Sequence, residues 1–445
     1  MKRRKTFAYL TFLLIGIMLF MGNSVVAQDS LRLTLIDALK IADSENLSVM
    51  IADKEIVKTK YAKKGTYASL FPQIDFSGNY QRAIKKQVVV FAGQSFEMGL
   101  NNTYTTGFSM AMPLVSFPLW KSLKISAMDV ELAVEKAKSS RQDLIDQVQQ
   151  TFYTVLLAMD SYKVYKENYD NTVKNYEEVK QKYESGTTAK YDLIRAEVNV
   201  QNAEPALYNA MNSVVVAQWK LKALIGIDLN TPIICDGTLM DYTNKLEMVS
   251  LSDTMSVDNN SNLKQLYIQN NMLEQNYKTQ LAKYYPSLNL SVNYQWMAMD
   301  DTYKFSSYNW NPYSTGILSL TIPIFSGGKR YHDLKQTRVQ QEQMKMQIED
   351  VRRNLEVAVK QTLSSLETAV KQFDAAKKGI EGAETGYEIS RKRYEIGSGT
   401  LLEMSDAQLA LLQARLNLNQ SIYNYLVAKS SLDKTLGVNE IPINE

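Results

Sequence analysis

Two carboxylates three residues apart, Glu403 and Asp406, have the spacing in this chain that is most suggestive of chemistry. Residues three apart lie on one face of a helix, so a symmetric assembly would gather several copies of both around its axis. Such a ring attracts cations and repels anions. The alternative is that both acids are ordinary solvated charges near a helix N-terminus, where negative charge is favoured.

Catalytic and metal chemistry has little support elsewhere in the sequence. The chain has one cysteine, Cys235, and one histidine, His332. These counts allow no intramolecular disulfide, no cysteine or histidine zinc site and no choice of histidines for a Ser-His-Asp triad. Gly327-Gly328 lacks the spacing and the Lys-Ser/Thr ending of a phosphate-binding loop. We therefore expect no enzymatic activity, no metal site and no cofactor.

A strand-like segment occurs twice. Pro72-Gln-Ile-Asp-Phe-Ser-Gly-Asn-Tyr-Gln81 returns as Pro286-Ser-Leu-Asn-Leu-Ser-Val-Asn-Tyr-Gln295, and both copies alternate apolar and polar residues. This period of two predicts strands with one apolar face. A second pair follows, Phe108-Ser-Met-Ala-Met-Pro-Leu114 and Leu318-Ser-Leu-Thr-Ile-Pro-Ile324, which predicts two hairpins. The expected strands cover about 73–81, 106–115, 287–296 and 316–325. The residues expected on the apolar face are Phe76, Tyr80, Leu290, Val292, Tyr294, Trp296, Leu318 and Leu320.

The repeat continues beyond the strands and divides the chain into two homologous halves. Tyr183-Glu-Ser-Gly186 returns as Tyr394-Glu-Ile-Gly397, displaced by 211 positions. Two long copies indicate a duplicated half rather than a solenoid of many units. We expect a first repeat over 28–227, an inter-repeat segment over 228–262, a second repeat over 263–437 and a C-terminal tail over 438–445.

Long helices separate the strands. Apolar residues recur at steps of three and four from about Trp120 to Glu184 and from Arg330 to Glu395, and neither segment has an internal proline. At ~1.5 Å per residue such a helix is a rod of roughly 100 Å.

Shorter helices are expected beside these rods. They cover about 35–70 and 190–224 in the first half and about 263–285 and 401–436 in the second, and two of them stacked end to end would match one rod. Pro205 should kink or locally end the helix that contains it, because proline lacks the backbone donor.

The N-terminus has the three parts of an export signal. Lys2-Arg-Arg-Lys5 precedes an apolar core and the small-residue site Val25-Val-Ala27, so residues 1–27 are expected to be a cleaved signal peptide. An uncleaved membrane anchor is the alternative, although the apolar core is shorter than the ~20 residues of a spanning helix. Removal of this leader takes four of the 50 Lys and Arg residues and leaves 46 against 47 acidic ones. A net charge near minus one argues against a nucleic-acid partner.

Strand length and strand number together predict an oligomer. Four strands of about nine residues match a bilayer crossing, but four strands cannot close a barrel, and an open sheet edge is not viable in lipid. Three copies would supply twelve strands. The fold class expected is thus mainly α, with four strands per chain completing a trimeric twelve-stranded transmembrane barrel and long coiled-coil helices forming a periplasmic α-barrel.

In its duplicated halves, its Pro-initiated strands and its Tyr-x-x-Gly turns, the chain resembles the TolC family of outer-membrane channel proteins. The resemblance covers essentially the whole mature chain. It implies an outer-membrane location extending into the periplasm, a homotrimer, and a passive exit duct for a tripartite efflux pump or a type I secretion system. Its implied partners are a periplasmic adaptor protein, an inner-membrane transporter of the RND, ABC or MFS class, and outer-membrane lipid.

The same resemblance implies roles for residues at the two turns. Tyr394 matches the family's gate tyrosine, Asp192 its partner aspartate, and Glu403 and Asp406 its two ring aspartates. One departure is Gly399, which stands where the family's best-known gate has a tethering arginine. The turns that would dock the adaptor contain Gly186, Thr187, Gly397, Ser398 and Gly399.

Two other functions fit parts of the sequence. An exported coiled-coil spacer or adhesin would use the same helices without a pore, and a periplasmic hydrolase would need a catalytic constellation that we do not find. The exported substrate is not specified by these residues.

Overall fold

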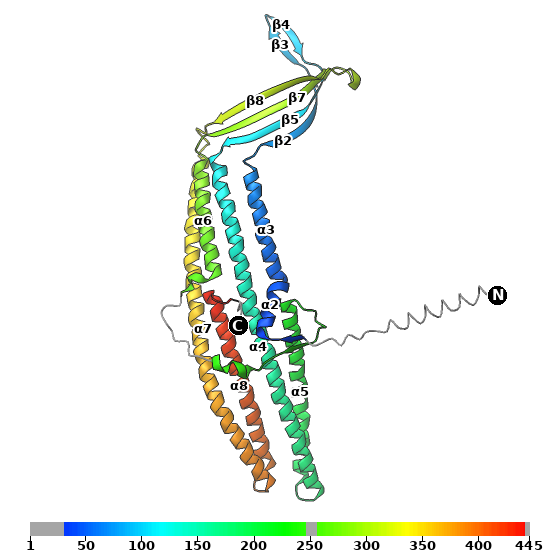
Figure 1. Cartoon of the computed structure of the whole chain (residues 1–445), viewed down its shortest axis with the longest axis vertical. Coiled ribbons are helices and arrows are strands. Elements are labelled where there is room, and N and C mark those ends of the chain that lie inside the picture. The colour runs from blue at the N-terminus through cyan, green and yellow to red at the C-terminus, as the bar shows by residue number, and fades with distance from the viewer. Residues whose placement is uncertain (1–30, 246–255, 441–445) are drawn as a thin grey trace, which may run out of the picture.

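The protein is an elongated molecule with a small sheet at one end and long helices running away from it (Figure 1). The computed structural model describes residues 31–245 and 256–440. The expected signal peptide, residues 1–27, lies outside these ranges, as do parts of the inter-repeat segment and of the C-terminal tail. None of the helices in the described ranges carries an apolar stretch long enough to span a bilayer.

Four antiparallel strands form the sheet, in the order β2-β5-β7-β8. The two expected hairpins are its outer pairs, and the two halves of the chain meet where β5 pairs with β7. Strand ends differ from the expected ones chiefly at β8, which stops before Pro323 because proline has no N–H to donate to the ladder. The strands are β2 (Gln73–Arg82), β5 (Asn102–Val115), β7 (Ser287–Asp300) and β8 (Asn311–Thr321).

Two long helices run from the sheet to the far end of the molecule without a break. They are α4 (Phe117–Glu184) and α7 (Lys329–Glu395), of 68 and 67 residues. Each turns back into a 36-residue helix, α5 (Lys190–Ile225) or α8 (Leu401–Leu436). These four helices agree closely with the periodicity of the sequence. At ~1.5 Å per residue the long helices measure about 100 Å.

The expected single helix over 35–70 is instead two helices. α2 (Leu35–Glu45) ends where Asn46 leaves helical geometry, and α3 (Leu47–Ala68) begins directly after it. The Asn46 side chain accepts from Ser48 N at 2.9 Å and donates to Leu224 O at 2.8 Å. It therefore caps α3 and fastens it to the end of α5.

The second half has an equivalent connection between its two shorter helices. Asn260 caps α6 (Ser261–Ala282) and donates to Thr435 O at 2.9 Å, near the end of α8. Glycine is required at both joints: Gly226 and Gly437 have φ of 80° and 73°, and an added Cβ would lie 2.9 Å from Glu45 O and 2.4 Å from Asn259 O. The two shorter helices of each half are therefore stacked end to end beside one long helix, as expected.

Pro205 does not end its helix, since α5 continues from Lys190 to Ile225. The expectation of a local end is therefore wrong, and a kink at Pro205 stays a prediction. α5 packs along α4, and such packing supplies most of a helix's stability in a folded protein, which outweighs one missing hydrogen bond.

Small elements complete the fold. A hairpin of β3 (Gln87–Phe91) and β4 (Gln94–Met98) projects beyond the sheet (Figure 1). A short parallel pair, β1 (Leu31–Leu33) and β6 (Ile233–Cys235), lies beside the main core, where Phe152, Leu221 and Ile422 are fully buried. The short 3-10 helices are η1 (Leu239–Lys245), η2 (Val257–Asn259) and η3 (Phe305–Ser307).

Candidate functional site

The end of the molecule opposite the sheet is formed by the two helix-to-helix turns (Figure 1). Gly186 and Gly397 adopt φ of 74° and 73°, a left-handed conformation that glycine takes without strain. Residues after them close the long helices: Thr187 N donates to Lys182 O and Ser398 N donates to Arg393 O, each at 2.8 Å. Both turns are solvent-exposed, which leaves Gly186, Thr187, Gly397 and Ser398 accessible to a partner.

Gly399 lies in a tighter place than the other turn residues. A Cβ there would lie 3.0 Å from the Cβ of Arg393 and 3.2 Å from Glu403 Oε2. The Arg393 guanidinium donates to Ser398 O at 3.2 Å and lies 3.8 Å from Glu403. An arginine is thus present at this turn, although it comes from α7 rather than from position 399.

Tyr394 is buried where the two helix pairs meet. Its hydroxyl has no hydrogen-bond partner among the described residues, and Asp192 instead accepts from Thr188 Oγ1 at 2.9 Å. Burial raises the pKa of the Tyr394 phenol, and the negative charges of Asp192 and Glu178 raise it further. Lys182 Nζ lies 4.2 Å from the centre of the ring. Tyr394 packs in a cluster with Val179, Ala196, Tyr387, Leu401 and Met404.

The two expected ring carboxylates have different surroundings within one chain. Glu403 forms a capping box with Thr400: each backbone N–H donates to the other's side chain at 3.2 Å. Asp406 is exposed and lies at the edge of a cavity that Arg195 also lines. Glu403 thus has a structural role at the start of α8, and a shared ring of both acids stays a prediction that depends on assembly.

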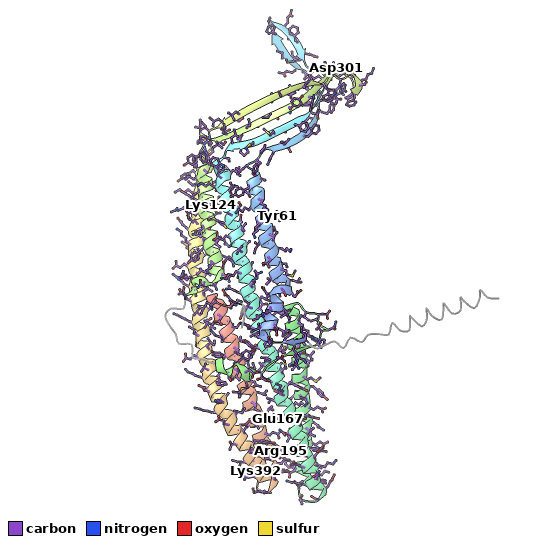
Figure 2. The ribbon with its side chains drawn as sticks, in the orientation of Figure 1. Tyr61, Lys124, Glu167, Arg195, Asp301 and Lys392 are labelled. Carbon is purple, nitrogen blue, oxygen red and sulfur yellow. The ribbon has the colours of Figure 1, made fainter. Side chains whose placement is uncertain are left out.

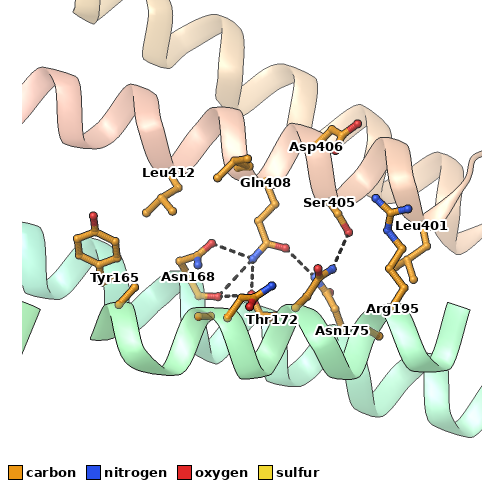
Figure 3. Close-up of a pocket in the computed structure, with 16 residues that line it drawn as sticks. Tyr165, Asn168, Thr172, Asn175, Arg195, Leu401, Ser405, Asp406, Gln408 and Leu412 are labelled. Atoms are coloured by element: carbon orange, nitrogen blue, oxygen red, sulfur yellow. Dashed lines mark hydrogen bonds between the residues drawn. The ribbon is translucent and has the colours of Figure 1, made fainter. Parts of the chain in front are cut away.

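A cluster of amide side chains joins α8 to α4 beside this cavity of about 380 Å³ (Figure 3). Gln408 Nε2 donates to Asn168 Oδ1 at 3.0 Å and to Thr172 Oγ1 at 2.8 Å, while its Oε1 accepts from Asn175 at 3.0 Å. We call Asn168, Thr172, Asn175 and Gln408 the amide cluster. The sequence analysis missed it, although its signal is present: polar amides occupy positions where the helix periodicity places a packed side chain.

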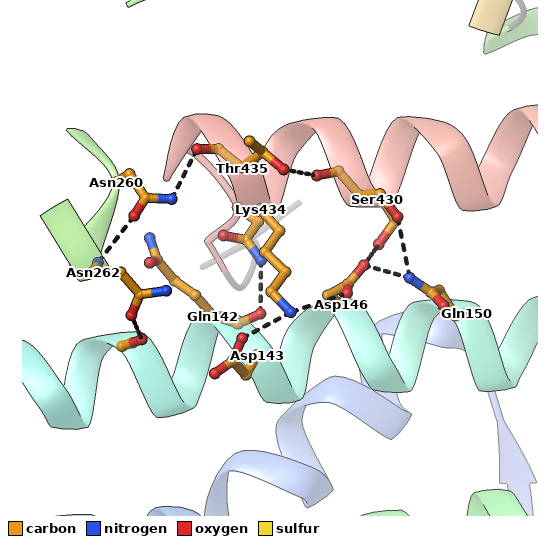
Figure 4. Close-up of polar contacts among 12 residues, drawn as sticks. Gln142, Asp143, Asp146, Gln150, Asn260, Asn262, Ser430, Lys434 and Thr435 are labelled. Carbon is orange, nitrogen blue, oxygen red and sulfur yellow. Dashed lines mark hydrogen bonds and ion pairs between the residues drawn. The ribbon is translucent and has the colours of Figure 1, made fainter. Parts of the chain in front are cut away.

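Ion pairs also join the same two helices at two places, one near the end of α8 (Figure 4) and one nearer the tip, where Figure 2 labels Glu167. Lys434 of α8 lies 2.8 Å from Asp143 and 3.5 Å from the buried Asp146. Ser430 Oγ donates to Asp146 Oδ1 at 2.7 Å. Nearer the tip, Arg415 lies 2.6 Å from Glu167 of α4. The contact between α4 and α8, here called the α4/α8 interface, is therefore largely polar outside the main core.

The register of the sheet brings the expected apolar residues to one face. Phe76 lies opposite Phe108, which lies opposite Tyr294, and residues directly opposite in a sheet project to the same side. Leu290 lies opposite Leu318 in the same way. All eight residues expected on the apolar face share it, whereas its contact with lipid stays a prediction. These eight are Phe76, Tyr80, Leu290, Val292, Tyr294, Trp296, Leu318 and Leu320.

A four-stranded antiparallel sheet continued by long paired helices, in two repeated halves, is the architecture expected of an outer-membrane channel protein that extends into the periplasm. The sequence profile of the outer membrane efflux protein family matches residues 39–227 and 255–438. The chain therefore belongs to this family.

Individual relatives agree with this assignment at low sequence identity. Outer membrane protein TolC of Vibrio cholerae is 20% identical over 335 residues, which cover 75% of this chain and 76% of that one. The CmeC outer membrane channel of Campylobacter jejuni superposes with a TM-score of 0.73 at 19% identity, covering 92% of this chain and 87% of CmeC. The open state of the MtrE outer membrane channel of Neisseria gonorrhoeae gives 0.72 at 18% identity, covering 91% and 88%.

The expected resemblance, fold class and location are thereby confirmed. A family of efflux channels also favours the channel over the spacer and the hydrolase that the sequence left open.

Proposed function

We propose that three copies of this chain form a channel that is the exit duct of a tripartite efflux pump or a type I secretion system. The observation that carries the proposal is the four-stranded sheet with two unpaired edges, β2 and β8, and one apolar face. An unpaired edge is not viable in lipid, so β8 of one copy pairs with β2 of the next. Three copies close twelve strands, an even number in the range of outer-membrane barrels.

The internal repeat supports this closure and gives its register. Within one chain, Phe108 of β5 lies opposite Tyr294 of β7. Applying the displacements of the repeated strands to this pair gives Leu318 of β8 opposite Tyr80 of β2 in a second copy. Leu318 and Tyr80 both lie on the apolar face, so the pairing between copies keeps one continuous apolar surface.

The helices continue the barrel into a periplasmic tunnel whose tip is the gate. In this proposal the exposed turns that contain Gly186, Thr187, Gly397, Ser398 and Gly399 dock a periplasmic adaptor, which links the channel to an inner-membrane transporter. Tyr394 and Asp192 lie where the helix pairs meet, and threefold symmetry gathers Glu403 and Asp406 into a ring that favours cations.

Two measurements test the proposal on the mature full-length protein in detergent. Light scattering coupled to size-exclusion chromatography should give the protein mass of three chains, and reconstitution into planar bilayers should give stepwise ion conductance. A monomeric mass in several mild detergents, or trimers that never conduct even when the tip is destabilised, would contradict it.

A further inference from the structure

The internal repeat relates every element of one half to an element of the other. Over the helical part the displacement is 211 positions, so α5 (Lys190–Ile225) maps onto α8 (Leu401–Leu436), and α4 and α7 end at equivalent residues. Each contact between the two halves of one chain therefore has an equivalent contact in which the halves are exchanged. One chain cannot make this equivalent contact by itself, because it joins the second half of one copy to the first half of another.

The α4/α8 interface is such a contact. Near the tip the helices lie in the order α7, α8, α4, α5, so that α5 and α7 are the outermost helices on opposite sides (Figure 1). The equivalent of α8 against α4 is α5 of one copy against α7 of another. We call this second contact the α5/α7 interface.

Exposed apolar side chains on α5 occupy positions whose equivalents on α8 are buried. Met211 is 51% exposed, whereas its equivalent Ile422 is 0% exposed. Trp219 is 50% exposed, whereas its equivalent Ser430 is 4% exposed. A surface that is covered in one half is therefore uncovered in the other, and it carries large apolar side chains where it is uncovered.

The helix proposed to face this surface, α7, also carries an apolar residue where its equivalent, α4, carries a polar one. Asp146 of α4 accepts from Ser430 in the α4/α8 interface, and the equivalent of Asp146 on α7 is Val357, which is 52% exposed. The polar pair Asp146 and Ser430 thus becomes the apolar pair Val357 and Trp219. The two positions are therefore both polar in one half and both apolar in the other, which is compatible with a contact between Val357 and Trp219.

A charged pair gives independent support, because its signs are reversed. Arg415 of α8 pairs with Glu167 of α4 at 2.6 Å. Their equivalents are Glu204 of α5 and Lys378 of α7, an acid and a base exchanged between the two helices. Neither Glu204 nor Lys378 has an ion pair within the described residues of this chain.

The amide cluster has no equivalent on the outer side. Asn168 and Asn175 of α4 correspond to Gly379 and Gly386 of α7, and a Cβ at either glycine would meet nothing within 4 Å. Gln408 corresponds to Glu197. Glycine is therefore not required there by packing within the chain, and a bare helix face is left for a close neighbour.

We propose that α5 of one copy packs along α7 of a second copy of this chain, with Trp219 against Val357 and Glu204 paired with Lys378. This proposal rests on the trimer of the proposed function and names its helical contact. The trimer then has two kinds of helical interface in alternation. The one within each chain combines the apolar core with the amide cluster and ion pairs, and the one between copies combines apolar packing with a reversed ion pair.

Cross-linking tests the contact in the full-length protein. In a Cys235→Ala background, Glu204→Cys combined with Lys378→Cys is treated with a short bifunctional thiol reagent in native membranes, and denaturing gels should show bands of two and three chains. The matched control is Glu167→Cys with Arg415→Cys, which should link within one chain and leave the band at one chain.

A charge exchange tests the ion pair without cysteines. Glu204→Lys alone should lower the temperature at which the trimer dissociates, and adding Lys378→Glu should restore it. If light scattering gives a trimer but the 204–378 variant links no copies together, the interface is wrong while the trimer stands. If the protein is monomeric, both the interface and the proposed function are wrong.

Discussion

Replacement of Gln408 by alanine should destabilise the closed tip. The Gln408 amide makes three close contacts across the α4/α8 interface, to Asn168, Thr172 and Asn175. A hydrogen bond contributes about 1 kcal/mol net, so removal of three partly buried ones costs about 2–3 kcal/mol. Since 1.4 kcal/mol is a tenfold change, the population of a state in which α8 has separated from α4 should rise about 30- to 140-fold.

The assay is single-channel conductance of the reconstituted trimer, scored as the fraction of time in the open level. Gln413→Ala is the matched control, because Gln413 is an exposed amide of the same helix whose hydrogen bond, within the part of the chain that the structure describes, goes to Asn417, one turn along α8. Gln408→Glu is a second variant of nearly the same shape: it loses the donor to Asn168 and Thr172 and should behave like the alanine variant. If Gln408→Ala assembles and gates like the parent, the amide cluster does not hold the tip.

Three further outcomes are expected. Tyr394→Phe should leave closure unchanged or make the tip slightly more stable, since the buried hydroxyl has no hydrogen-bond partner among the described residues. A channel that opens in this variant would show instead that a hydrogen bond to Tyr394 holds the gate. Burial raises the pKa of Tyr394, so the stability that its neutral form contributes is complete below the ordinary tyrosine pKa of about 10 and is lost as the pH rises through the higher folded pKa. The melting temperature of the parent should therefore fall more at alkaline pH than that of Tyr394→Phe. Glu403→Gln with Asp406→Asn should weaken cation selectivity in planar bilayers, and unchanged reversal potentials would leave the acids as a helix cap and a surface charge. Leu290→Lys should impair membrane assembly more than Ser291→Lys. If the two variants assemble equally well, the apolar face of the sheet does not contact lipid.

The bounds of α8 could be predicted closely because local residues determine where the helix begins and ends. α8 begins after Thr400, whose side chain caps it, and ends at Gly437, which has the left-handed conformation of a helix C-terminus. The alternation of apolar and polar residues likewise predicted the two hairpins and the apolar face, since successive side chains of a strand point to opposite faces of the sheet. These features depend on neighbours within a few positions in the sequence.

Features that depend on distant contacts were not predicted. The break at Asn46 follows from a bond to Leu224, and the amide cluster joins residues more than 200 positions apart. Asp192 is near enough for its charge to raise the pKa of the Tyr394 phenol, but its carboxylate accepts a hydrogen bond from Thr188 rather than from Tyr394. The β3–β4 hairpin had a local signal that we missed: two strand-like runs on either side of Ala92-Gly93, both at positive φ.

The two unpaired edges of the sheet matter before assembly as well as after it. A newly exported single copy exposes the backbone groups of β2 and β8 together with an apolar face, and such edges pair readily with the wrong chain. In the proposed trimer the correct pairing needs three copies to meet, so its rate falls more steeply on dilution than the pairing of two wrong edges does. We therefore expect the share of exported chains that assemble correctly, rather than aggregate through their strand edges, to depend on how many copies are present together.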